Sequence, residues 1–420
     1  MKTQRLGRDF MRLWLAQSIS AVGSEISAVA IPLFAVTTLG FGAHELGFVL
    51  AMEGIPPVLF GLFAGVWVDR LSRRTILLAS DILRFLLVLS MPLLYWAGWF
   101  TTPVLFVCTF LIASITVFFD IAYWSYLPSI VAKDELAHGN SRLSMTQSIA
   151  TTGGPSLAGA ITSFIGPPAA LVLDALSYLA SFLFLTGTRR PQPAASDEPA
   201  PPVLAALREG LAFVLGNRFL IMLALGAATW HLIYFSTLTN FYLYLARDLA
   251  APPYVVGLLL SCGGLGALAG APLVPKLRDT IGSVPLLCAT LVVAQTALLA
   301  IPFVREHALL PEVMLGSALF FGGAASTAHS VVHVTLRQET TPQALLGRMT
   351  SIVRLVTWGA IPAGSLAGGL LAQSMSSRDA FHIISLVGYG LTAAWVLAIV
   401  TVPGFGRALP PLAGHNGQPG

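Results

Sequence analysis

A single carboxylate interrupts the first long apolar segment of the chain: Glu25 lies near the middle of residues 11–38. Polar side chains stand beside it at helical spacing, namely Gln17, Ser20, Ser24 and Ser27. An ionisable group inside a bilayer costs about 2.5–3.5 kcal/mol and is rarely kept without a role. Because burial favours the protonated form of a carboxylate, we predict that Glu25 takes up a proton and competes or pairs with a cationic substrate. An ion pair with a neighbouring helix is the alternative.

Three further ionisable residues lie inside other apolar segments. Glu53 could line an external vestibule or form a structural pair, Asp174 favours a structural role, and His231 is a proton-relay candidate or a hydrogen-bonded helix contact. Aromatic residues recur beside His231 at helical spacing: Trp230, Tyr234 and Phe241. Such a stripe can stack on a planar or cationic substrate, or it can pack one helix against another.

The composition indicates what kind of protein presents these residues. Of 420 residues, 55% are hydrophobic and 10% are charged, whereas soluble domains carry about 25% charged residues. The apolar runs reach the length of about 20 residues that spans hydrocarbon. We predict an all-α polytopic membrane protein. The net charge of +4 comes from dispersed basic residues, which argues against a nucleic-acid partner.

The sequence offers no cofactor or metal motif. The cysteines Cys108, Cys262 and Cys288 occur singly, and the His329 and His333 pair has no carboxylate or cysteine companion nearby. The glycine-rich stretch 261–272 lacks a following Lys-Ser/Thr and is therefore not an ATP-binding loop. We expect an ion gradient, or the gradient of the substrate itself, to supply the energy.

Twelve membrane spans are expected, and charge sets their orientation. They cover 11–38, 46–67, 75–97, 103–125, 141–165, 168–187, 219–245, 254–275, 284–304, 310–333, 346–374 and 380–402. Of the 23 Lys and Arg residues, all but Arg247, Arg305 and Arg378 fall on one side of this arrangement. Since cationic residues are retained on the cytoplasmic side, we expect both termini in the cytoplasm and the chain in the cell membrane.

The chain divides into two similar halves. At an offset of 209, PSLAG at 155–159 faces GSLAG at 364–368. We predict a six-helix bundle over 1–187, a cytoplasmic linker with an interfacial helix over 188–218, a second six-helix bundle over 219–404 and a cytoplasmic tail over 405–420.

The loop after the second span carries a family resemblance. GVWVDRLSRR at 65–74, which includes Gly65, Asp69, Arg70, Arg73 and Arg74, resembles the loop 2–3 signature of major facilitator superfamily transporters. The segments 118–136, 213–219 and 336–351 resemble the branch that contains macrolide exporters and the enterobactin exporter. The resemblance implies two pseudo-symmetric bundles of six helices each.

The resemblance also implies roles for two groups of residues. Asp69 would cap the helix at 346–374 and Arg73 would pair with Asp120, which together would form a latch on the cytoplasmic side; topology signalling is the alternative reading, and it applies to Arg74. TGGPSLAG at 152–159, with Gly154, Pro155 and Gly159, resembles the glycine-proline antiporter motif of drug exporters. Its other reading is a kinked packing helix.

We therefore predict a secondary active transporter that exports amphipathic small molecules such as drugs, macrolides or siderophores in exchange for protons. It would work as a monomer in the lipid bilayer. An importer or uniporter on the same fold is the alternative, and a ligand-binding sensor without flux is a third. An intramembrane enzyme would need clustered acids such as DxxxD, which the sequence lacks.

Overall fold

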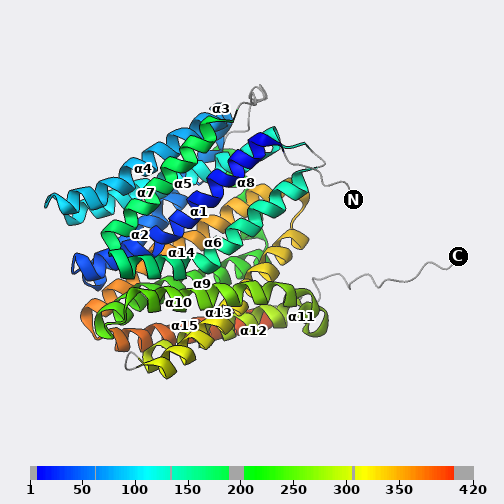
Figure 1. Ribbon diagram of the computed structural model, residues 1–420. Coiled ribbons are helices and arrows are strands. Elements are labelled where there is room, and N and C mark those ends of the chain that lie inside the picture. Colours follow the sequence, from blue (N-terminus) through cyan, green and yellow to red (C-terminus); the bar gives the residue numbers. More distant parts are fainter. Residues whose placement is uncertain (1–6, 62, 133–134, 189–202, 305–307, 402–420) are drawn as a thin grey trace.

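The computed structural model describes residues 7–61, 63–132, 135–188, 203–304 and 308–401, with the backbone alone at 66, 69, 70 and 203–206. Every regular element within these ranges is helical (Figure 1). The first half holds α1 (Arg8–Leu33), α2 (Ala43–Phe60), α3 (Ala64–Arg70), α4 (Arg73–Trp96), α5 (Thr102–Ile130), α6 (Leu136–Ile165) and α7 (Pro167–Thr186). The second half holds α8 (Val203–Gly216), α9 (Arg218–Leu243), α10 (Pro253–Gly270), α11 (Val274–Ile281), α12 (Ser283–Leu298), α13 (Leu309–Thr340), α14 (Leu346–Ser374) and α15 (Ser377–Thr401).

Ten spans of the described chain are long and apolar enough to cross a membrane. The predicted spans 46–67 and 141–165 correspond to α2 and α6, which are not among the ten. α2 has only 18 residues and includes Glu45 and Glu53, and α6 begins with a polar run. Both pack between other long helices, α2 against α5 and α14, and α6 against α1 and α10. The polar start of α6 is largely exposed, and the contacts of both helices with their long neighbours complete the two bundles.

The predicted second span is also interrupted. α2 ends at Phe60 and α3 begins at Ala64. Pro56 and Pro57 lie in the last turns of α2, where their missing N–H groups weaken the helix before it ends. The break places Gly65, Asp69 and Arg70 of the family motif on the separate short helix α3, whereas Arg73 and Arg74 begin α4.

The two halves repeat each other in their hydrogen bonds as well as in sequence. α1 and α9 each end in a π-helical turn, at Phe34–Thr38 and at Tyr244–Asp248, 210 positions apart. Leu39 N–H donates to Phe34 O over 3.0 Å, and Leu249 N–H donates to Tyr244 O over 2.9 Å. An internal repeat of this kind is typical of transporters built from duplicated bundles.

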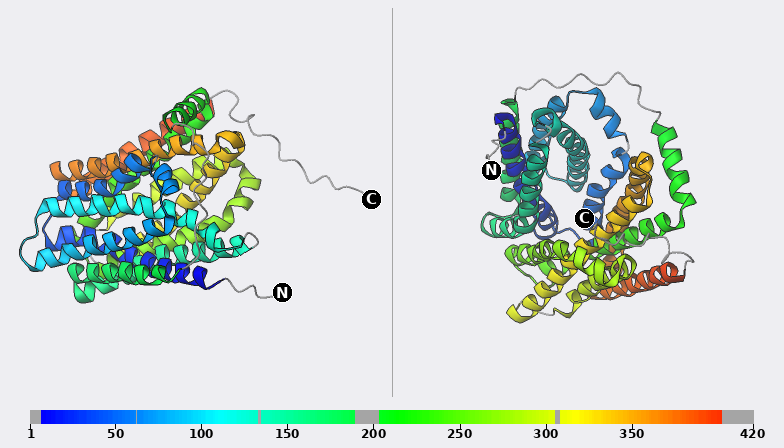
Figure 2. Two further views of the ribbon diagram at one scale, coloured as in Figure 1. Left: turned by 90° about the horizontal axis from the view of Figure 1, so that it is seen from above. Right: turned by 90° about the vertical axis from the view of Figure 1, so that its right-hand side faces the viewer.

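α1 begins and α15 ends at the same end of the molecule, which we call the terminal end; η1 and η3, the two π-helical turns, lie at the opposite, far end (Figures 1 and 2). The buried apolar residues form one cluster that joins both halves near the far end and includes Phe34, Phe41 and Tyr244. Towards the terminal end the halves have separate clusters, one around Tyr126 and one around Leu287. The halves are therefore sealed together at the far end and have independent cores at the terminal end.

Glycines allow the helices of the two halves to approach each other closely at the far end. A Cβ on Gly369 of α14 would lie 3.1 Å from Cα of Gly47 on α2. A Cβ on Gly257 of α10 would lie 3.0 Å from Cα of Gly159 on α6. Small residues allow helix backbones to approach in this way inside a membrane. The two contacts, α2 with α14 and α6 with α10, are the main interfaces between the halves.

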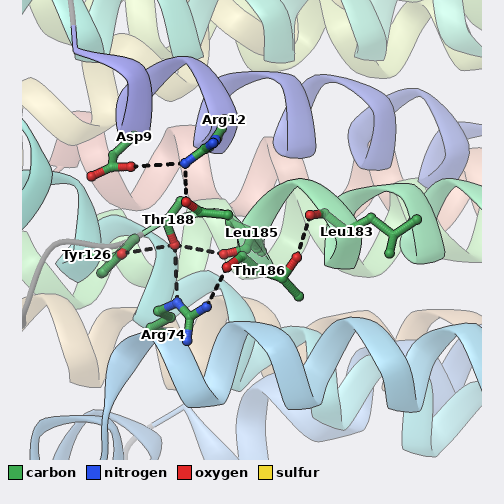
Figure 3. Close-up of polar contacts among 9 residues, drawn as sticks. Asp9, Arg12, Arg74, Tyr126, Leu183, Leu185, Thr186 and Thr188 are labelled. Carbon is green, nitrogen blue, oxygen red and sulfur yellow. Dashed lines mark hydrogen bonds and ion pairs between the residues drawn. The ribbon is translucent and has the colours of Figure 1, made fainter.

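Arginines hold the terminal end of the first half together (Figure 3). Arg74 donates to Thr186 O over 2.8 Å and to Thr188 Oγ1 over 3.3 Å, and Arg12 donates to Gly187 O. These carbonyls belong to the last turn of α7, where helix carbonyls lack partners and attract cations. Arg74 therefore ties α4 to α7 in addition to any effect on topology.

α8 forms the helix expected in the linker, and it packs on the start of α14. Arg348 pairs with Glu209, and a Cβ on Gly210 would lie 2.8 Å from Arg348 O. Phe213 and Val214 pack into the apolar cluster of the second half. The helix therefore packs as part of the second half.

Replacing Arg84 with glutamine is expected to destabilise the fold. Arg84 Nη2 lies 2.6 Å from Asp81 Oδ1, and both side chains are buried. Removing one partner of a buried pair costs about 3–5 kcal/mol because the other charge is left uncompensated. Thermal unfolding in detergent would measure the loss, and the double variant D81N/R84Q should recover most of it. Arg278→Gln is the control, because its pair with Glu339 is partly exposed and contributes about 0–1 kcal/mol.

Candidate substrate and proton site

The predicted residue Glu25 lies in a cavity between the halves. This Glu25 cavity has a volume of about 450 Å³, which falls within the range of roughly 300–1,000 Å³ typical of small-molecule sites. α1 and α6 of the first half contribute Glu25, Ala28, Val29, Thr151 and Pro155, and α9, α10, α12 and α13 of the second half supply most of the remaining wall. A molecule in the cavity would touch both halves.

The second half presents aromatic rings and one histidine to Glu25. Trp230 and Tyr234 line the cavity with their ring centroids 5.5 Å apart. His231 also lines it, and its Nδ1 lies 2.8 Å from Ala227 O. A carbonyl only accepts hydrogen bonds, so Nδ1 is the donor of this bond. The cavity thus combines a carboxylate, an imidazole and stacking surfaces.

Phe241, the third aromatic residue of the predicted stripe, lies outside this cavity. Its side chain is 3% exposed and belongs to the apolar cluster at the far end. The stripe runs along one helix, but the cavity ends before the far-end seal begins. Phe241 therefore packs in the core, in line with the helix-packing interpretation of the stripe.

Ser24 and Glu53 line a second cavity, mainly in the first half. This Glu53 cavity has a volume of about 680 Å³. It contains the carboxylates Glu53, Asp120 and Asp174 and the guanidinium of Arg354. Acidic groups outnumber basic ones among these lining residues, so the wall favours a cationic or zwitterionic ligand. Ala28 of α1 lines both cavities, which are therefore neighbours across one helix.

Asp174 is held in a buried hydrogen-bond network. Its side chain is 0% exposed, Ser27 donates to Oδ2, and Ser177 donates to Oδ1 over 3.1 Å. Nearby, Ser24 and Tyr178 hydrogen-bond over 2.9 Å, and the Arg84 guanidinium lies 4.4 Å from the centre of the Tyr178 ring. These contacts tie α1 to α7 and agree with the structural role expected for Asp174.

Gln17 and Ser20 lie nearer the start of α1, outside both cavity walls. Ser20 is buried, and Gln17 Oε1 is buried without a hydrogen-bond partner among the residues that the structure describes. Only Ser24 and Ser27 of the predicted polar stripe reach the Glu53 cavity. The polar stripe runs along α1, but the Glu53 cavity extends along only the part that carries Ser24 and Ser27.

The glycine-proline motif lies against Glu25. A Cβ on Gly154 would lie 2.5 Å from Cβ of Glu25, so only glycine leaves room for that side chain. Pro155 lines the Glu25 cavity, and Gly159 packs on Gly257 at the seal. One short stretch of α6 therefore contacts both the carboxylate and the interface between the halves.

The predicted gate residues lie at the terminal end of the first half. Gly65, Asp69 and Arg70 belong to α3, and the side chains of the last two lie outside the described part of the structure. Arg73 donates to Ser125 O on α5 over 2.9 Å. Its pair with Asp120, and the cap by Asp69, stay predictions. Asp120 instead lines the Glu53 cavity, together with Arg354 from the other half.

Sequence reasoning missed several cavity residues. Arg354 and Trp358 of α14 line the Glu53 cavity, and the Arg354 guanidinium lies 4.5 Å from the centre of the Trp358 ring. Tyr178 and Trp124 also line it. The spacing of four residues between Arg354 and Trp358 could have indicated a shared helix face, but no local pattern places α14 and α5 in the wall of one cavity.

The paired histidines of α13 make helix contacts. His333 Nε2 lies 2.8 Å from Leu223 O, and His329 Nδ1 lies 3.2 Å from Leu287 O. No group of three or more metal-ligating side chains occurs in the part of the chain that the structure describes. These rings link α13 to α9 and α12.

Two repeated helical bundles around ligand-sized cavities at their interface define a secondary transporter. Comparison of the sequence with protein families assigns this chain to that class. Residues 6–413 match the family model described as transmembrane secretion effector. The chain belongs to this family of the major facilitator superfamily, as the loop resemblance had implied, and it is a multi-pass membrane transporter of an efflux or secretion family.

Relatives cover nearly the whole chain. The multidrug efflux pump Tap of Mycolicibacterium fortuitum is 26% identical over 402 residues, which cover 92% of this chain and 94% of the pump. The enterobactin exporter EntS of Citrobacter koseri is 26% identical over 434 residues, which cover 98% and 95%. Macrolide efflux protein A of Streptococcus pyogenes is 23% identical over 375 residues, which cover 89% and 91%.

Solved structures share the fold. The nucleoside transporter NupG superposes with a TM-score of 0.74 at 12% identity and covers 95% of this chain and 98% of its own. A bacterial homologue of the iron transporter ferroportin, in an inward-facing state, superposes with a TM-score of 0.69 at 20% identity, covering 94% and 100%. At these sequence identities the superpositions show a shared fold.

Proposed function

We propose that this protein exports amphipathic small molecules in exchange for protons by alternating access. One observation carries the proposal: Glu25, a lone carboxylate, lies between the halves in the same cavity as the aromatic rings of α9. A proton and a cationic or zwitterionic substrate can compete for such a group, which couples their movements. The exporter names of Tap, EntS and macrolide efflux protein A support the direction of transport.

The terminal end is the cytoplasmic end in this proposal. The excess of Lys and Arg on that side of the sequence supports this assignment. With the halves sealed at the far end and their cores separate at the terminal end, the described state is inward-facing. Release to the outside then requires the seals at α2–α14 and α6–α10 to separate while the terminal end closes.

Transport in inverted membrane vesicles tests the proposal. Respiration acidifies the vesicle interior, so an antiporter should concentrate a cationic dye, a macrolide or enterobactin inside, and nigericin should abolish the accumulation. Vesicles without the protein are the control. Equilibration of probe without accumulation would indicate a uniporter, and accumulation driven by the opposite gradient would indicate an importer.

A further inference from the structure

Arg354 is the only cation among the described residues that line the Glu53 cavity. It comes from α14, and the second half contributes only Arg354 and Trp358 to this wall. The guanidinium lies over the Trp358 ring, 4.5 Å from its centre, and it makes no hydrogen bond or ion pair with any residue that the structure describes. Stacking on an aromatic ring orients a guanidinium without using its N–H groups. These donors are therefore available to a molecule in the cavity.

The charges around Arg354 do not neutralise it by direct contact. Arg337 of α13 lies close enough to repel it, and Arg337 Nε is buried without a hydrogen-bond partner in the described part of the chain. Asp120 of α5 attracts Arg354, but the two side chains form no ion pair in the described structure. Neighbouring cations without a paired carboxylate create a positive potential that attracts an anion.

The carboxyl group of Glu53 lies at a different level of the same cavity. The adjacent residue Gly54 packs on α14, where an added Cβ would lie 2.7 Å from Ile361 Cγ2. Arg354 precedes Ile361 on that helix by about two turns, or roughly 10 Å at a rise of about 1.5 Å per residue. The cavity therefore has an acidic side group towards the far end and a basic one towards the terminal end.

We infer that Arg354 and Trp358 bind the carboxylate of a planar zwitterionic substrate, whose cationic group lies towards Glu53. The inference builds on the proposed function, because it names the substrate class. A planar guanidinium can donate two parallel hydrogen bonds to one carboxylate, and Trp124 and Tyr178 add aromatic surfaces to the wall. A purely cationic molecule would leave the donors of Arg354 unused and would lie near a like charge, so it should bind more weakly.

Dye binding to the purified protein tests this inference without relying on transport. Rhodamine B is an aromatic zwitterion, and its methyl ester has the same ring system and cationic charge but no carboxylate. Fluorescence anisotropy in detergent would give the dissociation constant of each dye. The unmodified protein should bind rhodamine B at least about tenfold more tightly than the ester, which corresponds to about 1.4 kcal/mol.

Variants of α14 assign the preference to Arg354. Arg354→Gln should weaken binding of rhodamine B until the two dyes bind within about twofold of each other, and Arg354→Lys, which keeps the charge but loses the planar fork, should retain part of the preference. Arg348→Gln is the matched control on the same helix, because Arg348 pairs with Glu209 and lines neither cavity. It should keep the full preference, and it corrects for uptake of the dyes by detergent.

Each result decides the inference. Equal affinity of the unmodified protein for the two dyes, or binding of neither, would overturn it, and this comparison needs no variant. A preference that persists in a folded Arg354→Gln protein would also overturn it, because the carboxylate would then bind elsewhere. Failure of proton-driven export in vesicles, with the dye preference intact, would remove the proposed function alone. Export of a cationic dye by a protein without the preference would remove this inference alone.

Discussion

Glu25→Gln is expected to abolish the accumulation of substrate against its gradient while retaining a weakened substrate exchange. One pH unit corresponds to 1.36 kcal/mol for each proton moved, so a coupled antiporter can build about a tenfold substrate gradient per proton exchanged. Glutamine keeps the shape of the side chain and its contact with Gly154, but it cannot carry a proton. In proteoliposomes with an imposed pH gradient, the accumulation ratio should fall to about one.

Counterflow separates lost coupling from lost folding. Exchange of labelled for unlabelled substrate needs no net proton movement, so Glu25→Gln should retain it at lower affinity through the aromatic rings of α9, and Glu25→Asp should retain both activities in part. Glu45→Gln is the control, since Glu45 Oε2 accepts from Gly42 N–H at the start of α2 and glutamine can accept the same bond. Undiminished accumulation by Glu25→Gln would remove this residue from the coupling mechanism. Loss with Glu53→Gln instead would transfer the role to the Glu53 cavity.

The placement of Glu25 could be anticipated from the sequence because its signals are local. An isolated carboxylate in an apolar segment is costly wherever it lies, so it indicates a cavity. The Gly154–Pro155 motif could likewise be found by its residues. The neighbours of this motif in space could not be predicted. The contact of Gly154 with the Glu25 side chain joins α6 to α1, and no spacing within α6 specifies that partner.

The positions that the sequence could not specify have the same origin. Periodicity identified the face of α9 that carries Trp230 and Tyr234, but it could not say where along the helix the cavity stops, and Phe241 lies beyond that point. Arg354 lies on α14 of the second half, yet it lines a cavity formed mostly by the first half. Such residues depend on how the bundles are placed against each other, and that placement depends on close helix contacts far apart in the sequence.

The close contacts also set the conformational balance, and Gly257→Val tests this. A Cβ at Gly257 would overlap Pro155 O and lie 3.0 Å from Gly159 Cα, so valine cannot be accommodated while the far end is sealed. Overpacking costs about 1–3 kcal/mol. Because this penalty falls only on the sealed state, the population should shift towards the far-end-open state by about 5- to 150-fold.

Labelling of a buried far-end position measures that shift. Ala43→Cys, at the α2–α14 contact, in a chain without its own cysteines, should react with an aqueous maleimide faster by the same factor when Gly257 is valine. Gly153→Val on α6 is the matched control, because a Cβ there meets nothing within 4 Å. An unchanged labelling rate in a folded Gly257→Val protein would mean that the α6–α10 contact persists in both states. The halves would then have to move by a route other than separation at this seal.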